Sequence, residues 1–196
     1  MTPLTFRLAT PDDGPSIQDL VQSAFRAADT RKNWTADLEL GRNFSVELES
    51  VLATIKKPNR GILLAFTGVT AGTDTLQSEN GSEHLVASVE ITKKSPKRAR
   101  FSLFAVHHQF QQGGIGRRVL AQAELYCQEK WGSVIFELDA LSTREELIAW
   151  YERQGYEQTG MLTSFPVQIY PDLDLSHNLA FVEMEKCVKL EVQVQG

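Results

Sequence analysis

The chain has 196 residues, of which 42% are hydrophobic and 23% are charged, and its formal net charge is −5. This length suits one domain with a sizeable core. The negative net charge argues against nonspecific binding of DNA or RNA, which requires clustered basic charge. No apolar run reaches the roughly 18 residues of a membrane span, and residues 1–7 lack the pattern of a secretory signal. We therefore expect a cytoplasmic protein without a nucleic-acid or membrane partner, whose cysteines, Cys127 and Cys187, are buried free thiols.

The first quarter of the chain predicts a short strand followed by two helices. The strand lies around Phe6 and Leu8, and Thr10 then has the character of a helix N-cap, with Asp13 three residues later. Two sets of apolar residues follow at helical spacing. They are Ile17, Leu20, Val21, Ala24 and Phe25, and then Phe44, Leu48, Val51, Leu52 and Ile55. Pro58 ends the second helix.

Three apolar segments after Pro58 predict an antiparallel meander. They cover residues 61–69, 84–92 and 100–106. The stretch at about 70–83 is rich in Gly, Ser, Thr, Asn and Asp, so it predicts a mobile loop between the first two strands. The lysines and arginines between 93 and 100 are expected to mark a solvated turn.

The second half of the chain changes to alternating strands and helices. The expected order is a strand at 101–106, a glycine turn at 113–116, a helix at 117–130, a strand at 134–139, a helix at 143–153, and a final strand pair at 156–162 and 179–186. Strand, helix and strand at this spacing predict a right-handed parallel βαβ unit. The expected fold is therefore one α/β (α+β) domain over residues 1–196, with a mostly antiparallel mixed sheet, flanking helices, one parallel step and a tail at about 188–196.

A glycine-rich turn lies between the strand and the helix of this unit. Its glycines, Gly113, Gly114 and Gly116, let the backbone approach a ligand closely, and the free N–H groups and the dipole of a helix start attract an anion. Arg117 and Arg118 follow in the first helical turn, where positive charge opposes the dipole. Two interpretations stay open for these arginines: attraction of a bound polyanion such as a diphosphate, or extension into water.

Two other nucleotide-binding signatures do not fit this turn. A P-loop requires Gly-Lys-Ser or Gly-Lys-Thr, whereas Arg117 and Arg118 stand after these glycines. A dinucleotide fingerprint requires G-x-G-x-x-G in an opening βαβ unit, and the spacing here differs. The turn by itself therefore indicates an anion site without identifying the ligand.

Two motifs together resemble the GNAT superfamily of N-acetyltransferases. Gln111-x-x-Gly114-x-Gly116 fits the family's Q/R-x-x-G-x-G/A signature, and residues 150–156 resemble its F/Y-Y-x-x-x-G-F/Y segment. The distance between the motifs is also typical, and the pair is more specific than either motif alone. The order of elements over roughly residues 6–186 matches the GNAT fold.

The resemblance implies acetyl-CoA as co-substrate, and no metal. In this family the strand before the turn offers its backbone to the pantetheine arm, and the turn binds the pyrophosphate. The residues that match these roles are Phe104, Ala105 and Val106 on the strand, and Gln111, Gln112, Gly113, Gly114, Ile115, Gly116 and Arg117 on the turn. His108 departs from the family pattern, because many relatives have Pro there.

The resemblance also implies direct acyl transfer, in which a neutral amine attacks the thioester carbonyl and the thiol of coenzyme A leaves. Tyr151 matches the family's frequent tyrosine acid, although its helical spacing alone fits a core aromatic. Glu137 matches a glutamate that acts as proton acceptor in some members, if a one-residue insertion follows it. Glu90 and water are alternative acceptors, and both carboxylates are equally compatible with an exposed or hydrogen-bonded structural role.

A second departure from the family concerns the start of the helix that carries Tyr151. Many relatives have a cofactor-binding Asn there, and Arg144 occupies that place. Ser142 or Thr143 could replace the contact, although capping the helix is the role we favour.

The acceptor is expected to lie between two variable segments, at 26–43 and 164–178, since specificity in this fold resides mainly there. We expect a primary amine, favouring a small molecule over a protein amino group. A non-catalytic acyl-CoA-binding sensor is the alternative from another class. The sequence leaves the acceptor, the physiological role and the oligomeric state open, and a homodimer is among the assemblies it allows.

Overall fold

The computed structural model describes residues 3–27, 38–68, 83–111, 113–175 and 178–188. Their strands form a seven-stranded sheet in the order β1-β2-β3-β4-β5-β7-β6. The strands are β1 (Leu4–Leu8), β2 (Arg60–Thr67), β3 (His84–Ser95), β4 (Arg98–Val106), β5 (Ile135–Leu141), β6 (Glu157–Ser164) and β7 (Ala180–Cys187). Every neighbouring pair is antiparallel except β4 with β5. The predicted mixed sheet with one parallel step is therefore confirmed.

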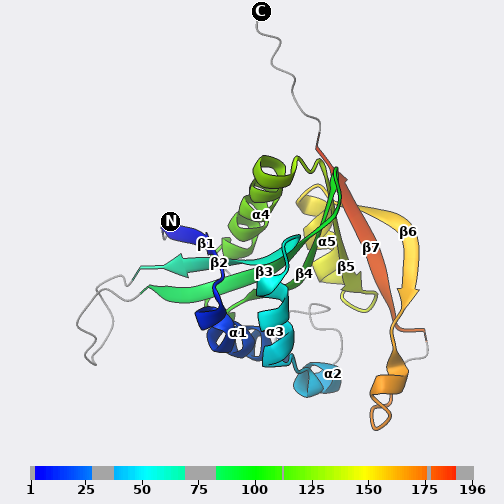
Figure 1. Cartoon of the computed structure of the whole chain (residues 1–196). Coiled ribbons are helices and arrows are strands. Elements are labelled where there is room, and N and C mark those ends of the chain that lie inside the picture. The colour runs from blue at the N-terminus through cyan, green and yellow to red at the C-terminus, as the bar shows by residue number, and fades with distance from the viewer. Residues whose placement is uncertain (1–2, 28–37, 69–82, 112, 176–177, 189–196) are drawn as a thin grey trace, which may run out of the picture.

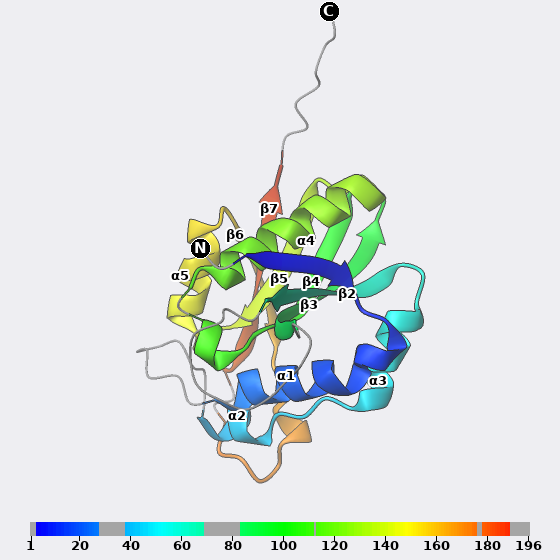
Figure 2. The same cartoon turned by 90° about the vertical axis from the view of Figure 1, so that its left-hand side faces the viewer.

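Helices cover both faces of the sheet. They are α1 (Gly14–Arg26), α2 (Leu38–Asn43), α3 (Leu48–Lys56), α4 (Ile115–Trp131) and α5 (Glu145–Arg153). Figure 2 shows α4 on one side of the strands and α1 and α3 on the other. Alternate residues of β2 therefore face different cores: Leu63 packs in the core beneath α4 and α5, whereas Leu64 packs in the core beneath α1 and α3.

The parallel pair β4–β5 holds together at only one end. Its register covers Arg98 to Arg100 on β4 and Ile135 to Glu137 on β5. Beyond that point the two strands separate, and Figure 1 shows β1–β4 and β5–β7 diverging from the end where they meet. The remaining length of β4 therefore presents one backbone edge that β5 does not pair with.

An irregularity in β4 lies just inside this split. The register with β3 jumps from Ser88–Ala105 to Glu90–Ser102, so β4 has an extra residue there. Leu103 has φ of 44°, a left-handed conformation that is rare for a branched side chain. Such bulges redirect side chains, and Leu103 packs toward α1 and α3.

Several expectations about the first half need correction. Phe44 precedes the second predicted helix, which begins at Leu48, but its ring still stacks on Phe25 with centroids 4.3 Å apart. Thr10 caps the short 3₁₀ turn Pro11–Asp13, through the carboxylate of Asp13, and α1 begins after this turn. The short helix α2 was not predicted. The predicted loop at about 70–83 and tail at about 188–196 lie almost entirely outside the described residues.

Two further corrections concern surface chemistry. Cys127 is buried as predicted, and burial raises the pKa of its thiol to about 12, whereas Cys187 is exposed at the end of β7. Arg98 and Arg100 belong to β4 and are ion-paired across the sheet, so the basic turn is smaller than predicted. No helix in the described ranges is long and apolar enough to cross a membrane.

Candidate active site where the parallel strands separate

The glycine turn opens α4 at the end of β4. Gly114 is the N-cap residue, with φ of 72°, and α4 begins at Ile115, two residues earlier than predicted. A left-handed N-cap suits glycine because it has no Cβ. The N–H groups of the first helical turn have no partners within the helix. Binding of an anion by these N–H groups stays a prediction.

The space in front of this turn is open. A Cβ added to Gly114 would meet no atom within 4 Å, and one added to Gly113 would meet only the carbonyl oxygen of Phe110 at 3.8 Å. Gly116 differs, because its Cβ would lie 3.5 Å from the Trp150 ring on α5. Two of the glycines thus leave room for a ligand, and the third permits close packing of α4 on α5.

The turn is tied to the strand that precedes it. The side-chain amide of Gln111 donates a hydrogen bond to the carbonyl oxygen of Val106 at 3.2 Å. The backbone N–H of His107 donates to the carbonyl oxygen of Val86 on β3 at 2.9 Å. These bonds fix the helix start at the end of β4. Gln112, which the family resemblance places in the cofactor site, lies outside the described residues.

The predicted cofactor strand lies in the split between β4 and β5. Phe104, Ala105 and Val106 are the last three residues of β4, beyond its pairing with β5. The Phe104 ring packs against Trp150 with centroids 6.3 Å apart. The strand edge, the glycine turn and α5 therefore border the same opening, so the fold brings the two sequence motifs together.

Tyr151 lies on α5 and is buried, with 6% of its surface exposed. Its ring contacts those of Trp150 and Tyr156, at centroid distances of 5.0 and 5.9 Å. Burial raises the pKa of its hydroxyl to about 12. Tyr151 is thus part of the core and also a group that stays protonated at neutral pH, which a proton donor requires.

Glu137 lies where β4 and β5 still pair. Its carboxylate accepts a hydrogen bond from Arg98 at 2.5 Å, and the same guanidinium reaches Glu185 on β7 at 3.1 Å. Because β5 continues to Leu141, Glu137 stands in the first half of the strand. Its role as proton acceptor stays a prediction.

Asp139 is a carboxylate that the sequence reasoning missed. It lies two residues further toward the carboxyl end of β5, on the same face as Glu137, and is ion-paired with Arg100. Burial raises its pKa, and its charge in turn raises the pKa of Tyr151. A charged residue two positions from Glu137 was visible in the sequence, but the length of β5 was not.

The two segments expected to flank the acceptor meet in space. Leu40 on α2 packs with Leu175 and Leu179, which lie between β6 and β7. Figure 2 shows α2 beside this connection. The described parts of the predicted walls at 26–43 and 164–178 therefore form one apolar cluster beside the sheet.

The start of α5 differs from the expected cap. Arg144 is the N-cap residue and makes no side-chain capping bond. The hydroxyl of Ser142 instead accepts a hydrogen bond from the backbone N–H of Ala180 on β7, at 3.4 Å. Among the described residues, no group of three or more His, Cys, Asp or Glu side chains is arranged to hold a metal.

Comparisons with known proteins agree with this architecture. Residues 75–158 match the family model described as Acetyltransferase (GNAT) domain. No curated protein sequence matches significantly.

Solved structures resemble the whole chain at low sequence identity. The ribosomal-protein-S18-alanine N-acetyltransferase from Escherichia coli is 14% identical with a TM-score of 0.65, and the alignment covers 99% of each chain. A spermidine N-acetyltransferase from Vibrio cholerae, in complex with CoA and spermine, is 14% identical with a TM-score of 0.61, over 94% of this chain and 95% of that one.

A third structure was determined with acetyl coenzyme A. It is a putative streptothricin acetyltransferase from Bacillus anthracis, 15% identical with a TM-score of 0.53, over 75% of this chain and 71% of that one. At such identities these likenesses show the fold alone. Residues 75–158 are therefore similar to a GNAT acetyltransferase domain, and the solved N-acetyltransferase structures share the fold of nearly the whole chain.

Proposed function

We propose that this protein transfers an acetyl group from acetyl-CoA to the primary amine of a small molecule, by direct attack of the amine on the thioester. The observation that carries this proposal is the open, left-handed Gly114 turn beside the unpaired edge of β4. A turn filled by the protein's own side chains would have argued against any ligand there.

The residues around the split fit the parts of acetyl-CoA. The N–H groups at the start of α4 suit a pyrophosphate, and Arg117 in the first turn of the helix adds positive charge. The free backbone edge of Phe104, Ala105 and Val106 suits the amide groups of a pantetheine arm. When bound, acetyl-CoA supplies an activated acyl group on a thiol leaving group.

Two proton transfers are left to the chain. The attacking nitrogen must lose a proton, and the departing sulfur benefits from gaining one. We assign the second task to Tyr151, because it lies on α5 next to the Trp150 ring that packs against the glycine turn, and its hydroxyl is protonated at neutral pH. For the first task we favour Asp139 over Glu137. Asp139 is nearer the open end of β5 and interacts electrostatically with Tyr151.

In the proposed reaction the amine nitrogen forms a bond to the acetyl carbonyl carbon, and the bond from that carbon to sulfur breaks. The proton from nitrogen goes to Asp139, directly or through water, and Tyr151 donates a proton to the sulfur. The products are an N-substituted acetamide and free coenzyme A. Atoms and charge balance without an external oxidant or metal.

We favour a small-molecule acceptor because the described parts of the two acceptor-side segments pack on each other. The cluster around Leu40, Leu175 and Leu179 joins α2 to the segment before β7.

A panel of amines with acetyl-CoA tests the proposal. Release of free thiol, together with a mass gain of one acetyl group on an amine, is the expected result. A sensor would instead bind acetyl-CoA without release of thiol, and calorimetry with acetyl-CoA, ATP and NAD measures that binding. Absence of acetyl-CoA affinity would contradict both the enzyme and the sensor.

A further inference from the structure

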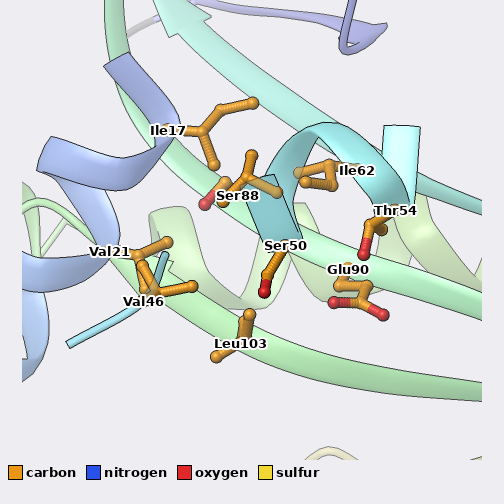
Figure 3. Close-up of a pocket in the computed structure, with 10 residues that line it drawn as sticks. Ile17, Val21, Val46, Ser50, Thr54, Ile62, Ser88, Glu90 and Leu103 are labelled. Carbon is orange, nitrogen blue, oxygen red and sulfur yellow. The ribbon is translucent and has the colours of Figure 1, made fainter. Parts of the chain in front are cut away.

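A cavity lies between the sheet and the helices α1 and α3, away from the glycine turn (Figure 3). Its volume is about 50 Å³, several times the roughly 10–15 Å³ that one water requires. Its walls are mostly aliphatic, and three hydroxyls and one carboxylate interrupt them. The lining residues are Ile17, Val21, Val46, Ser50, Val51, Thr54, Ile62, Ser88, Glu90 and Leu103.

The burial of these residues shows which end is open. Ser50 is exposed, and Val46 and Leu103 are half-buried. Ser88 is fully buried, with 0% of its surface exposed, and Ile17 has 2% exposed. The cavity therefore opens near Ser50 and Leu103 and ends at Ser88. Leu103 is the bulged residue of β4, so the mouth borders the strand on which the proposed cofactor site is built.

The floor of the cavity contains an unused polar group. The hydroxyl of Ser88 is buried and has no hydrogen-bond partner among the residues that the structure describes. Buried hydroxyls almost always have a partner, because removing one from water without replacement is costly. A ligand that carries an N–H or O–H group into the cavity would provide the missing partner.

A carboxylate lines another part of the same cavity. Glu90 lies two residues after Ser88 on β3, on the same face of the strand, and Figure 3 shows its carboxylate near the hydroxyls of Ser50 and Thr54. Burial raises the pKa of Glu90. Arg60 approaches one carboxylate oxygen at 3.6 Å, longer than a hydrogen bond, and 41% of the Arg60 side chain is exposed. A hydrogen bond with the Thr92 side chain and the charge of Lys57 also favour the ionised form. Burial outweighs these three interactions, so the charge of the carboxylate is only partly compensated.

The chemistry of the lining selects one class of ligand. An anion is disfavoured by Glu90, and a wholly apolar ligand would leave both Glu90 and Ser88 without a new partner. An ammonium group offers three N–H donors and a positive charge. The aliphatic walls, from Val21 to Val51, suit the methylene groups that carry it, and the small volume excludes a branched or aromatic group.

We propose that this cavity anchors the far end of the acceptor, and that the preferred acceptor is a short, unbranched diamine. One ammonium group binds at Glu90 and Ser88, and the other amine emerges at Leu103 to reach the thioester. This inference rests on the proposed function, because it identifies the acceptor of that reaction. Glu90 here is a binding residue rather than the proton acceptor.

Kinetics with matched amines test the anchor. The substrates are 1,3-diaminopropane and 1,4-diaminobutane, compared with propylamine and butylamine. With the wild-type protein we expect a KM at least ~10-fold lower for each diamine than for its monoamine, as one charge-assisted hydrogen bond provides. In Glu90→Gln this preference is lost and kcat is retained. Equal KM values for diamine and monoamine in the wild type would overturn the proposal.

The same comparison separates an anchor from a proton acceptor. A general loss of kcat in Glu90→Gln, on monoamines and diamines alike, would overturn the anchor and indicate catalysis instead. Glu49→Gln is the matched control, because this substitution makes the same chemical change on the exposed surface of α3, outside the cavity lining. It should keep the wild-type preference.

Binding measured without acetyl-CoA distinguishes failure of the inference from failure of the proposed function. We expect 1,4-diaminobutane, but not butylamine, to raise the melting temperature of the wild type and of Glu49→Gln. The shift should be absent in Glu90→Gln and in Ser88→Val, which fills the floor. A rise in melting temperature with the diamine, but no acetylation of any amine, would contradict the proposed enzyme activity and support the diamine site. Acetylation of amines without a rise in melting temperature that depends on Glu90 would contradict the diamine site and support the enzyme activity.

Discussion

The two proposed binding sites of this molecule are built by different means. At the proposed cofactor site, the ligand groups are backbone N–H and C=O groups of β4 and the start of α4, which one short stretch of chain supplies. On the acceptor side, the proposed contacts come from side chains on α1, α3, β2, β3 and β4. A backbone site needs glycine at fixed spacing, so it leaves a sequence motif, whereas a site made of distant side chains leaves none.

The same difference means that the choice of acceptor can change independently of the proposed cofactor site. The β4–β5 split is a consequence of strand geometry, and it can be kept while the acceptor side changes residue by residue. Substitutions on one side should therefore alter the affinity for acetyl-CoA, and substitutions on the other should alter turnover or the acceptor KM. Four predictions follow this division, from the largest expected effect to the smallest.

Gly114→Glu should abolish binding of acetyl-CoA. The glutamate side chain would fill the open space in front of the turn, and its negative charge would repel a diphosphate by about 1–4 kcal/mol at a separation of ~4 Å. Together, the lost space and the charge repulsion should leave no affinity that calorimetry can measure. Calorimetry with acetyl-CoA measures the effect.

Gly132→Glu is the control for that substitution. Gly132 ends the same helix with φ of 67°, and its Cβ would also meet no atom within 4 Å. This variant shares the backbone strain but lies at the far end of α4. Wild-type affinity is expected, and an equal loss in both variants would mean that strain, not the ligand site, explains the first result.

Asp139→Asn should lower kcat by about 10²- to 10⁴-fold, the range for loss of a general base, with unchanged affinity for acetyl-CoA. A proton acceptor works when ionised, so wild-type kcat should fall as pH drops through the raised pKa of Asp139, and the variant should lack this limb. Steady-state kinetics against pH measure both effects. Glu137→Gln provides the comparison, and a larger loss there would transfer the role to Glu137.

Tyr151→Phe should lower kcat by about 10-fold, less than the loss of the base. A thiol with a pKa near 8.5 leaves without much help, so the proton donor matters less than the acceptor. Because the pKa of Tyr151 is raised to about 12, wild-type activity should show no loss from its ionisation below that pH. A wild-type rate for Tyr151→Phe would mean that Tyr151 has only a structural role, as an aromatic residue of the core.

Asp13→Asn should affect stability alone. Asp13 pairs with Arg7 at 2.7 Å just before α1. Hydrogen bonding from Arg7 lowers the pKa of Asp13 to about 2. A folded-state pKa below the unfolded value stabilises above about pH 4, and this stabilisation is lost as pH falls toward 2.

Urea unfolding at two pH values measures that contribution. We expect Asp13→Asn to cost about 1 kcal/mol at pH 7 and almost nothing near pH 2. The affinity for acetyl-CoA should not change, because Asp13 lies on the acceptor side. A change in that affinity would contradict the division of the molecule into two independent halves.

The sequence by itself determined the fold class and the position of the cofactor turn. The spacing of apolar residues along the chain distinguishes helices from strands. The glycines at 113–116 indicate a turn whatever the rest of the chain does. The bounds of α4 and α5 were predicted to within two residues. The roles of Glu137 and Tyr151 stay predictions, since spacing alone cannot separate a core or ion-paired side chain from a catalytic one.

The tertiary structure decided what depends on residues far apart in the chain. The pairing of β4 with β5 ends after Arg100, and only this register shows where the sheet opens. The ion pair of Asp139 with Arg100 depends on the pairing of β5 with β4, and the Ser88–Glu90 cavity requires α1, α3 and three strands at once. Local patterns cannot contain such information, because burial and unmet hydrogen bonds are properties of packing between segments.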